Sequence, residues 1–587
     1  MNNLPNWNLN DLYNSPKDSD IEKDLENGLE SSKKLEQKYN SKIDKLDAED
    51  LYKVIIEYEN ISERLGKVST YSYLYFVTDL VNQEKAAFYQ NISEKINNIS
   101  QHLLFLPLEI SKISDDKLSS LYQSSKNLSQ YQPYIRDLRV FKKYQKSKEI
   151  EKILHEKDQT ANSAWSRLFD ETIAGLKFKF DKKSLSASEI FNLLSSHNKE
   201  ERKKAAKSIG KTLKNNIKIL TFITNVLAKD KSIDDKIRKY PHPVKSRNIS
   251  NLIEDKVVNS LVDTVKDNYK NLAHRYYKIK AGYFNQSYLD YWDRNSPLPD
   301  QKEEKISWQE AKKIVLDSYN RFSPEIASIV EKFFVNNWID AEPKAGKDSG
   351  AFAHPATPGT HPYIMVNFQG KLRDVMTLAH ELGHGAHQYL ARENGYLMSD
   401  TPLTLAETAS IFGEQLTFES LLVNCKNDNE KRNLLASKIE DSLNTIVRQI
   451  AFYLFELEVH TRRQKTELST EDLGNIWLQI QKESLGPAIK FYPEYKYYWS
   501  YIPHFIHSPF YVYAYAFGNC LVNSLYSSYK NGLTDFESKY IKALAAGGTM
   551  HHKELLEPFG LNAGDKDFWQ RGLEIPIEYI NQLEKLS

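Results

Sequence analysis

The sequence predicts a mainly α-helical fold. Only 22 glycines and 20 prolines occur among 587 residues, so helices can run without interruption and tight hairpins should be few. Apolar residues recur at helical spacing through the first part of the chain. No repeat with a period of roughly 20–50 residues stands out, so a repeat array is not expected.

Successive amphipathic helices are expected from about residue 18 to residue 127. Apolar side chains lie there at helical spacing among lysine, glutamate and serine, in two sets: Leu25, Leu29, Leu35 and Tyr39, then Val54, Ile55, Tyr58, Ile61 and Leu65. Another helix is expected over residues 164–176, and alternation predicts a short strand over 176–180. Residues 230–251, polar and with two prolines, predict a loop.

A domain boundary is expected near residue 185, where serines offer N-caps for the next helix. It separates an N-terminal helical region, residues 1–185, from a larger region, residues 186–587. The length would permit more domains, but large helical enzymes often form longer units.

Charge and cysteine content exclude several classes of protein. Lys and Arg total 79 and Asp and Glu total 78, which gives no support to a nucleic-acid or acidic-membrane partner. The two cysteines, Cys425 and Cys520, exclude a disulfide-rich scaffold and a cysteine-based zinc site. One bridge between them is the alternative, but two buried thiols in a reducing cytosol are expected. No secretory signal or long apolar stretch is visible, so the sequence predicts a soluble cytoplasmic protein.

Glycines and histidines gather late in the chain. Five glycines precede residue 346, whereas eight lie between Gly346 and Gly413. Five of the 15 histidines lie between His354 and His387. Backbone freedom together with possible metal ligands marks this stretch as the place to look for chemistry.

The strongest motif in that stretch is H-E-x-x-H, residues 380–384. Residues four apart share one helix face, so His380 and His384 can both bind one metal ion. Zinc accepts two imidazoles and a carboxylate, and Glu381 then lies beside the zinc-bound water as a general base. A chance match on a surface helix is the alternative, but the flanking residues are apolar and small.

A third ligand is expected on a following helix. Glu407 lies 27 positions after His380 among small residues that permit close helix packing, and it is preferred over Glu414. Thr404 and Glu407 also have capping-box spacing, but Thr401 as N-cap with proline at the next position is a better helix start. Glu414 is then expected to orient a histidine, and His387 to be a supporting or substrate-binding residue rather than a ligand.

An aromatic segment, residues 499–515, offers hydrogen-bond donors for the oxyanion that forms during peptide hydrolysis. His504, His507 and several tyrosines lie in it, and residues 491–530 hold ten of the 36 tyrosines. The alternative interpretation is an ordinary aromatic core helix with tyrosines at its rim.

These motifs together resemble the oligoendopeptidase F branch of the thimet-oligopeptidase-like zinc peptidases. The resemblance is carried by residues 367–387, 406–410, 503–504 and 510–518, and residues 7–13 and 163–169 are also similar. It implies a two-lobed helical clamshell with zinc deep in a channel and a small β element near the zinc helix, so that residues 186–587 form the zinc-peptidase region.

The resemblance also implies roles for individual residues. One zinc ion is bound by His380, His384 and Glu407, and Glu381 is the general base. His504, Tyr511 and Tyr513 match the donors that stabilise the transition state, with the two tyrosines unranked because the first tyrosine of the family's run is Phe510 here. Residues 351–354, which include Ala353 and His354, resemble the strand that pairs with substrate backbone.

The predicted function is therefore zinc-dependent hydrolysis of internal bonds in short unstructured peptides. Two alternatives remain open: a dipeptidyl carboxypeptidase, which needs a pocket for a free carboxylate, and a peptide-binding helical scaffold without catalysis. The scaffold would predict loss of Glu381 or of a ligand, yet all four positions are intact.

Overall fold

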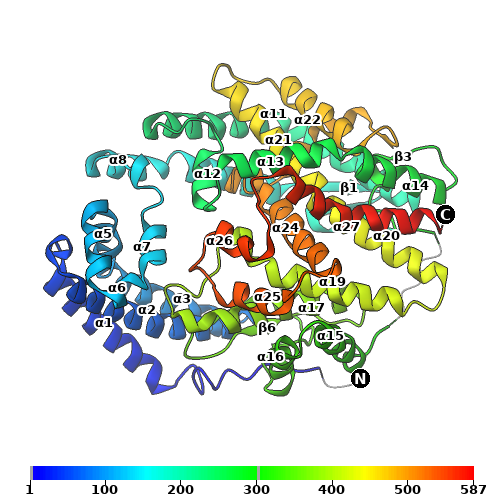
Figure 1. Ribbon diagram of the computed structural model, residues 1–587. Coiled ribbons are helices and arrows are strands. Elements are labelled where there is room, and N and C mark those ends of the chain that lie inside the picture. Colours follow the sequence, from blue (N-terminus) through cyan, green and yellow to red (C-terminus); the bar gives the residue numbers. More distant parts are fainter. Residues whose placement is uncertain (1–3, 300–304, 587) are drawn as a thin grey trace. The chain divides into compact units, whose positions relative to one another are not determined.

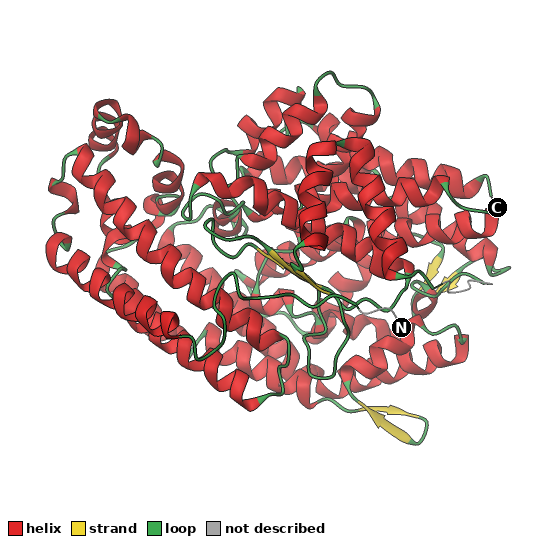
Figure 2. Cartoon of the chain, turned by 90° about the horizontal axis from the view of Figure 1, so that it is seen from below, coloured by secondary structure: helices red, strands yellow, loops and turns green. Residues whose placement is uncertain are grey.

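The computed structural model describes residues 4–299 and 305–586, and it is mainly helical, as predicted (Figures 1 and 2). Within these residues no strand is longer than three residues. The chain forms two compact units, each built from three segments. The first unit comprises Met1–Lys142, Glu303–Val423 and Ser528–Leu561, and the second comprises Lys143–Lys302, Asn424–Ser527 and Asn562–Ser587. The boundary near residue 185, the clamshell and its channel stay predictions.

The first unit begins with the expected amphipathic helices. An aspartate or asparagine side chain caps each of the first three: Asp18 before α1 (Ser19–Tyr39), Asp47 before α2 (Ala48–Val77) and Asn82 before α3 (Gln83–Gln101). Shorter helices follow: α4 (Phe105–Lys112), α5 (Asp115–Ser124), α6 (Lys126–Ser129) and α7 (Gln132–Leu138). Their buried apolar residues form one core that also includes Tyr363 and Met365.

A small sheet and the helix of the H-E-x-x-H motif lie in the same unit. Helices α15 (Trp308–Phe322) and α16 (Pro324–Val335) lead to a sheet with the order β4 (Ile339–Asp340), β6 (Tyr363–Met365) and β5 (Phe352–His354). The central strand β6 is parallel to β4 and antiparallel to the edge strand β5. Helix α17 (Leu372–Ala391) packs on β5 and β6, which confirms the small β element near this helix.

Two helices approach unusually closely beside the motif. Helix α19 (Thr408–Val423) packs on α17, and a Cβ atom at Gly383 would lie 2.4 Å from the Ala409 carbonyl oxygen and 2.6 Å from the Ser410 Cα. Gly413 leaves room for the Tyr319 hydroxyl, which donates to the Ala379 carbonyl at 2.9 Å. Main-chain atoms of the two helices therefore meet directly.

Replacing Gly383 by alanine is expected to destabilise the protein by about 1–3 kcal/mol, because the new methyl group meets main-chain atoms that cannot rotate away. Thermal unfolding measures the change. Gly282→Ala is the matched control, since an added Cβ there has no neighbour within 4 Å, and it should stabilise the helix by about 0.5–1 kcal/mol. Equal unfolding temperatures for Gly383→Ala and the unmodified protein would contradict the close approach.

The remaining helices of the first unit are α18 (Leu403–Ala406), α25 (Phe536–Ala545) and α26 (His552–Leu556). The second unit holds α8 (Lys148–Asp158), α9 (Asn162–Gly175), α10 (Ala187–Asn192), α11 (Lys199–Arg238), α12 (Lys245–Ser250), α13 (Asp255–Asp267), α14 (Arg275–Tyr283), α20 (Asp428–Thr445), α21 (Val447–Arg463), α22 (Thr470–Leu485), α23 (His504–His507), most of α24 (Tyr513–Lys530) and α27 (Lys566–Glu584). Its strands are β1 (Phe178–Phe180) with β2 (Lys183–Leu185), and β3 (Leu289–Asp290) with β7 (Ile489–Lys490).

The prediction of a loop over residues 230–251 is wrong. Helix α11 continues to Arg238 and α12 begins at Lys245, so only a short connection remains. Charged pairs one turn apart support the end of α11: Lys231 with Asp235 at 2.8 Å and Arg238 with Asp234 at 3.0 Å. The helix ends at Lys239, whose φ is +63°, and both prolines follow it.

Two composition-based expectations concern the whole chain. Cys425 and Cys520 are both free thiols, but only Cys520 is buried as expected, whereas Cys425 is partly exposed. Among the described helices, none combines the length and apolarity that crossing a membrane requires.

Candidate metal centre

The two histidines of the motif lie one turn apart on α17 and point the same way. Their Nε2 atoms are 3.1 Å apart, and their rings are nearly perpendicular, at 80°. The helix supplies this arrangement by its period alone, because residues four apart share a face. His380 and His384 thus offer two nitrogen donors to one point.

A carboxylate from the next part of the chain completes the group. Glu407 lies at the junction between α18 and α19, and its Oε2 atom is 3.5 Å from His380 Nε2 and 3.4 Å from His384 Nε2. Pro402, rather than the expected Thr401, is the N-cap of α18, because its ψ of 140° is not helical. The Thr401 hydroxyl instead lies 3.3 Å from His387 Nε2.

The three donor atoms fit a zinc ion. Zinc bonds of about 2.0–2.1 Å at tetrahedral angles place ligand atoms about 3.3–3.4 Å from one another. The separations here are 3.1, 3.4 and 3.5 Å. Two imidazole nitrogens and one carboxylate oxygen are also the donor set of a catalytic zinc site, which leaves one position open.

Two further side chains support the ligands. Glu414, two turns along α19, lies with Oε1 2.5 Å from Nδ1 of His380, on the ring nitrogen opposite the metal-facing one. Ser410 donates its hydroxyl to Glu407 Oε2 at 2.7 Å. Ser410 is not among the residues predicted from the sequence, although its place three residues after Glu407 at the start of a helix could have indicated this contact.

The carboxylates and histidines shift one another's pKa values. Burial raises the pKa of Glu407, but hydrogen bonding and charge from His384 and then the charge of His380 outweigh it and lower the pKa to about 2. Burial lowers the pKa of His380, but the hydrogen bond and the charge of Glu414 outweigh this effect and raise the pKa to about 9. Burial raises the pKa of Glu381, which is 6% exposed.

The edge strand and His387 lie close to the motif helix. Gln388 Nε2, on α17, donates to the Ala353 carbonyl of β5 at 3.1 Å, so this carbonyl already has a partner. The backbone N–H of Ala356 donates to His354 Nδ1 at 3.0 Å. Burial lowers the pKa of both His354 and His387 to about 4, so both rings are neutral near pH 7.

The aromatic segment belongs to the second unit and forms its own cluster. His504 begins α23, and its Nε2 lies 3.2 Å from the hydroxyl of Tyr515. The rings of His504 and Tyr511 are stacked at 6.0 Å, and those of Tyr511 and Tyr515 meet edge to face at 5.2 Å. Burial lowers the pKa of His504, and the charges of Arg448 and His507 add to the effect.

The two unranked tyrosines differ in their surroundings. Tyr513 is fully buried and its hydroxyl accepts from Asn251 Nδ2 at 2.9 Å, whereas Tyr511 is only half-buried. Tyr515, which belongs to the predicted aromatic segment but is not one of the two tyrosines singled out from it, is 37% exposed. Its place four residues after Tyr511 is the signal that could have found it. His507 is exposed and contacts Asp170 at 2.8 Å.

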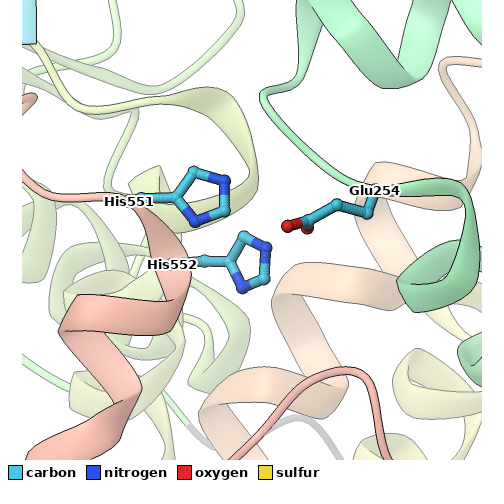
Figure 3. A group of neighbouring side chains, drawn as sticks. All are labelled: Glu254, His551 and His552. Atoms are coloured by element: carbon cyan, nitrogen blue, oxygen red, sulfur yellow. The ribbon is translucent and has the colours of Figure 1, made fainter.

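A second group of possible ligands is shown in Figure 3. His551 and His552 lie together at the start of α26, with ring centroids 4.2 Å apart, and Glu254 belongs to the second unit. Within the first unit this pair offers two donors, fewer than the three protein ligands of a catalytic zinc. His380, His384 and Glu407 therefore remain the candidate metal site.

Comparison with known proteins gives a consistent result. Residues 192–575 match peptidase family M3, and residues 109–178 match a region described as oligopeptidase F. The chain is 28% identical to oligopeptidase PepF of Bacillus subtilis, over 99% of this chain and 87% of that protein. It is 30% identical to an oligoendopeptidase F homolog of Borreliella burgdorferi, over 92% of this chain and 91% of that protein.

Solved structures show the same fold. Oligoendopeptidase F from Enterococcus faecium has a TM-score of 0.72 at 22% identity, covering 96% of this chain and 98% of that one. A structure from Chlamydophila abortus has a TM-score of 0.88 at 23% identity, covering 99% and 98%.

Proposed function

Because the chain belongs to peptidase family M3, we propose that it is a zinc-dependent oligoendopeptidase, which hydrolyses internal bonds of short unstructured peptides. The observation that carries this proposal is the set of three donor atoms from His380, His384 and Glu407, 3.1–3.5 Å apart, with Glu381 next to His380 in the chain. The relatives' names, oligopeptidase and oligoendopeptidase, support the preference for peptides over folded proteins.

The roles of the residues follow from their chemistry. Zinc held by His380, His384 and Glu407 would supply a Lewis acid that polarises the scissile carbonyl and makes water more acidic. Glu381 takes the proton from the attacking water and passes it to the leaving amine, so that the C–N bond breaks and a neutral amine departs. Glu414 holds the His380 ring in the orientation that leaves Nε2 for the metal.

His504 and the nearby tyrosines are proposed as donors to the oxyanion of the transition state. This proposal rests on their sequence match to the family. The surroundings of the tyrosines favour Tyr511 over Tyr513, because the Tyr513 hydroxyl is buried and occupied by Asn251. Removing one such donor typically costs about 10²–10³-fold in kcat.

A quenched-fluorescent peptide assay, with and without a chelator, tests the proposed function. We expect cleavage that stops on chelation and returns with added zinc, and mass spectrometry of the products should place the cuts at internal bonds. Release of successive C-terminal dipeptides would support the exopeptidase alternative. Peptide binding without cleavage by the zinc-loaded protein would refute both enzyme assignments.

Replacing Glu414 by alanine is expected to weaken zinc affinity by about 10–100-fold, because the His380 ring loses the carboxylate that orients it. Competition with a chromophoric chelator measures the affinity. Activity should recover when zinc is in excess. Glu419→Ala, on the same helix but paired with Lys530, is the matched control and should bind zinc normally. Unchanged affinity in Glu414→Ala would remove this role.

A further inference from the structure

The segment that carries Tyr511 contains a strained residue. Phe510 has a φ of +62°, in the left-handed region that residues with a side chain rarely adopt. Such a conformation persists only where the surroundings fix it. The Phe510 side chain is fully buried, whereas Tyr511 directly after it is half-buried.

Both polar groups of one peptide bond beside Phe510 are held by side chains of the second unit. Glu456 Oε1, on α21, accepts from the Phe510 N–H at 2.9 Å. Arg247 Nε, on α12, donates to the Pro509 carbonyl at 3.1 Å. Because this N–H and this carbonyl belong to the same planar peptide group, the two contacts fix the orientation of its plane.

Making this contact with the carboxyl group of Glu456 is energetically unfavourable. Its side chain is 2% exposed and its Oε2 atom has no hydrogen-bond partner. Burying a carboxyl group with one oxygen unsatisfied is unfavourable, and an apolar residue would be better for stability alone. The Phe510 ring packs against the same helix, 6.0 Å from Tyr453 and 5.0 Å from His460.

The buried carboxyl group is uncharged near neutral pH. Burial raises the pKa of Glu456 to about 8, although the Phe510 N–H, Arg247 and Lys231 each lower it. The charged and titratable groups facing it are Lys231 of α11, Arg247 of α12, and Tyr453 and His460 of α21. Burial lowers the pKa of His460 to about 3, so that ring is neutral too.

We propose that Glu456 is a positioning residue: by accepting the Phe510 N–H it holds the left-handed Phe510, and with it the orientation of Tyr511 beside His504. The inference rests on the proposed role of Tyr511 and His504 in peptide hydrolysis. It assigns Glu456 a function through the backbone, with no contact of its own to substrate.

The test compares Glu456→Leu with Glu456→Gln. Glutamine keeps a carbonyl oxygen to accept from Phe510, whereas leucine fills similar space without an acceptor. For Glu456→Leu we expect kcat to fall by about 10–100-fold with KM and zinc content unchanged, because the donor is misplaced only slightly. Glu456→Gln should retain nearly full kcat. Wild-type kcat in the leucine variant, or an equal loss in both variants, would overturn the proposal.

Two further tests complement this comparison. The variant Arg247→Met does not depend on the stability of Glu456→Leu, and hydrogen exchange does not depend on activity. Arg247→Met releases the other end of the same peptide group and also removes the guanidinium that lies 5.8 Å from the centroid of the Tyr511 ring, so kcat should fall at least as far as in Glu456→Leu. Hydrogen exchange followed by mass spectrometry should find the Phe510 amide protected in the unmodified protein and in Glu456→Gln, and rapidly exchanging in Glu456→Leu. An inactive unmodified protein would refute the proposed peptidase function, whereas equal exchange in all three proteins would refute the role of Glu456.

The pH dependence of stability provides a further prediction. The folded protein binds the Glu456 proton more tightly than the unfolded chain, because the pKa rises from 4.5 to about 8. Stability from this group is therefore complete below pH 4.5 and is lost as pH rises towards 8. Since glutamine cannot ionise, the melting temperature of Glu456→Gln should rise relative to that of the unmodified protein between pH 5 and 8. A constant difference would show that Glu456 does not titrate there.

Discussion

Replacing Glu381 by glutamine should lower kcat by about 10²–10⁴-fold while the protein keeps its zinc. The amide has nearly the same shape as the carboxylate, but it cannot take a proton from water or return one to the leaving amine. The three donor atoms proposed to hold zinc do not include Glu381, so metal binding should persist. Steady-state cleavage of a fluorescent peptide and elemental analysis of the same sample measure the two properties together.

The matched control is Glu393→Gln, just beyond the end of the motif helix. The Glu393 side chain is 83% exposed and pairs with its neighbour Arg392 at 3.6 Å, so its replacement should change neither kcat nor zinc content. A glutamine variant at position 381 with full activity would remove Glu381 from its role as base. Loss of zinc from that variant would mean that Glu381 supports the metal instead.

Replacing His384 by alanine should release the metal. Two protein ligands are too few to hold a catalytic zinc ion, and the Nε2 atom of His384 contacts both other donor atoms. Zinc content should fall from one ion per chain to nearly none, and activity should fall by about 10³-fold or more because several kcal/mol of charge stabilisation are lost. Elemental analysis after dialysis gives the first value and the peptide assay gives the second.

His102→Ala is the corresponding control in the same unit. His102 also faces a carboxylate, with Nδ1 2.6 Å from Glu36 Oε2, but it is outside the groups that could hold a metal ion. Its replacement should leave zinc content and activity unchanged. Stoichiometric zinc in the dialysed His384→Ala protein would refute the assignment of that ligand.

The grouping of His380, His384 and Glu407 could be predicted because its geometry is mostly local. His380 and His384 need only a helix, and Glu407 is a carboxylate that follows them among small residues. The structure brings these donors together with Glu414 beside them, as the order of the motifs indicates. The helical fold was predictable for the same reason, since periodicity and the scarcity of glycine are local properties.

Long-range contacts account for what the sequence did not indicate. Polar composition and two prolines predict a loop over residues 230–251, but the packing of α11 in the second unit helps to carry the helix to Arg238. The charged pairs that support this end of α11 are local, and the sequence could have indicated them. The burial of Tyr513 against Asn251 and the contact between Glu456 and Phe510 join residues 262 and 54 positions apart, respectively. No local sequence pattern predicts contacts between residues so far apart in the chain.

The absence of a side chain at Gly383 affects how well the geometry of the proposed metal site withstands substitutions around it. Because the carbonyl of Ala409 and the Cα of Ser410 lie where a Cβ would stand, main-chain atoms in contact set the distance between α17 and α19. Such atoms are nearly incompressible, unlike a layer of interlocking side chains that each substitution can thicken or thin. The core around the two helices can therefore be rebuilt with other residues while the spacing between the histidines and Glu407 keeps the same value.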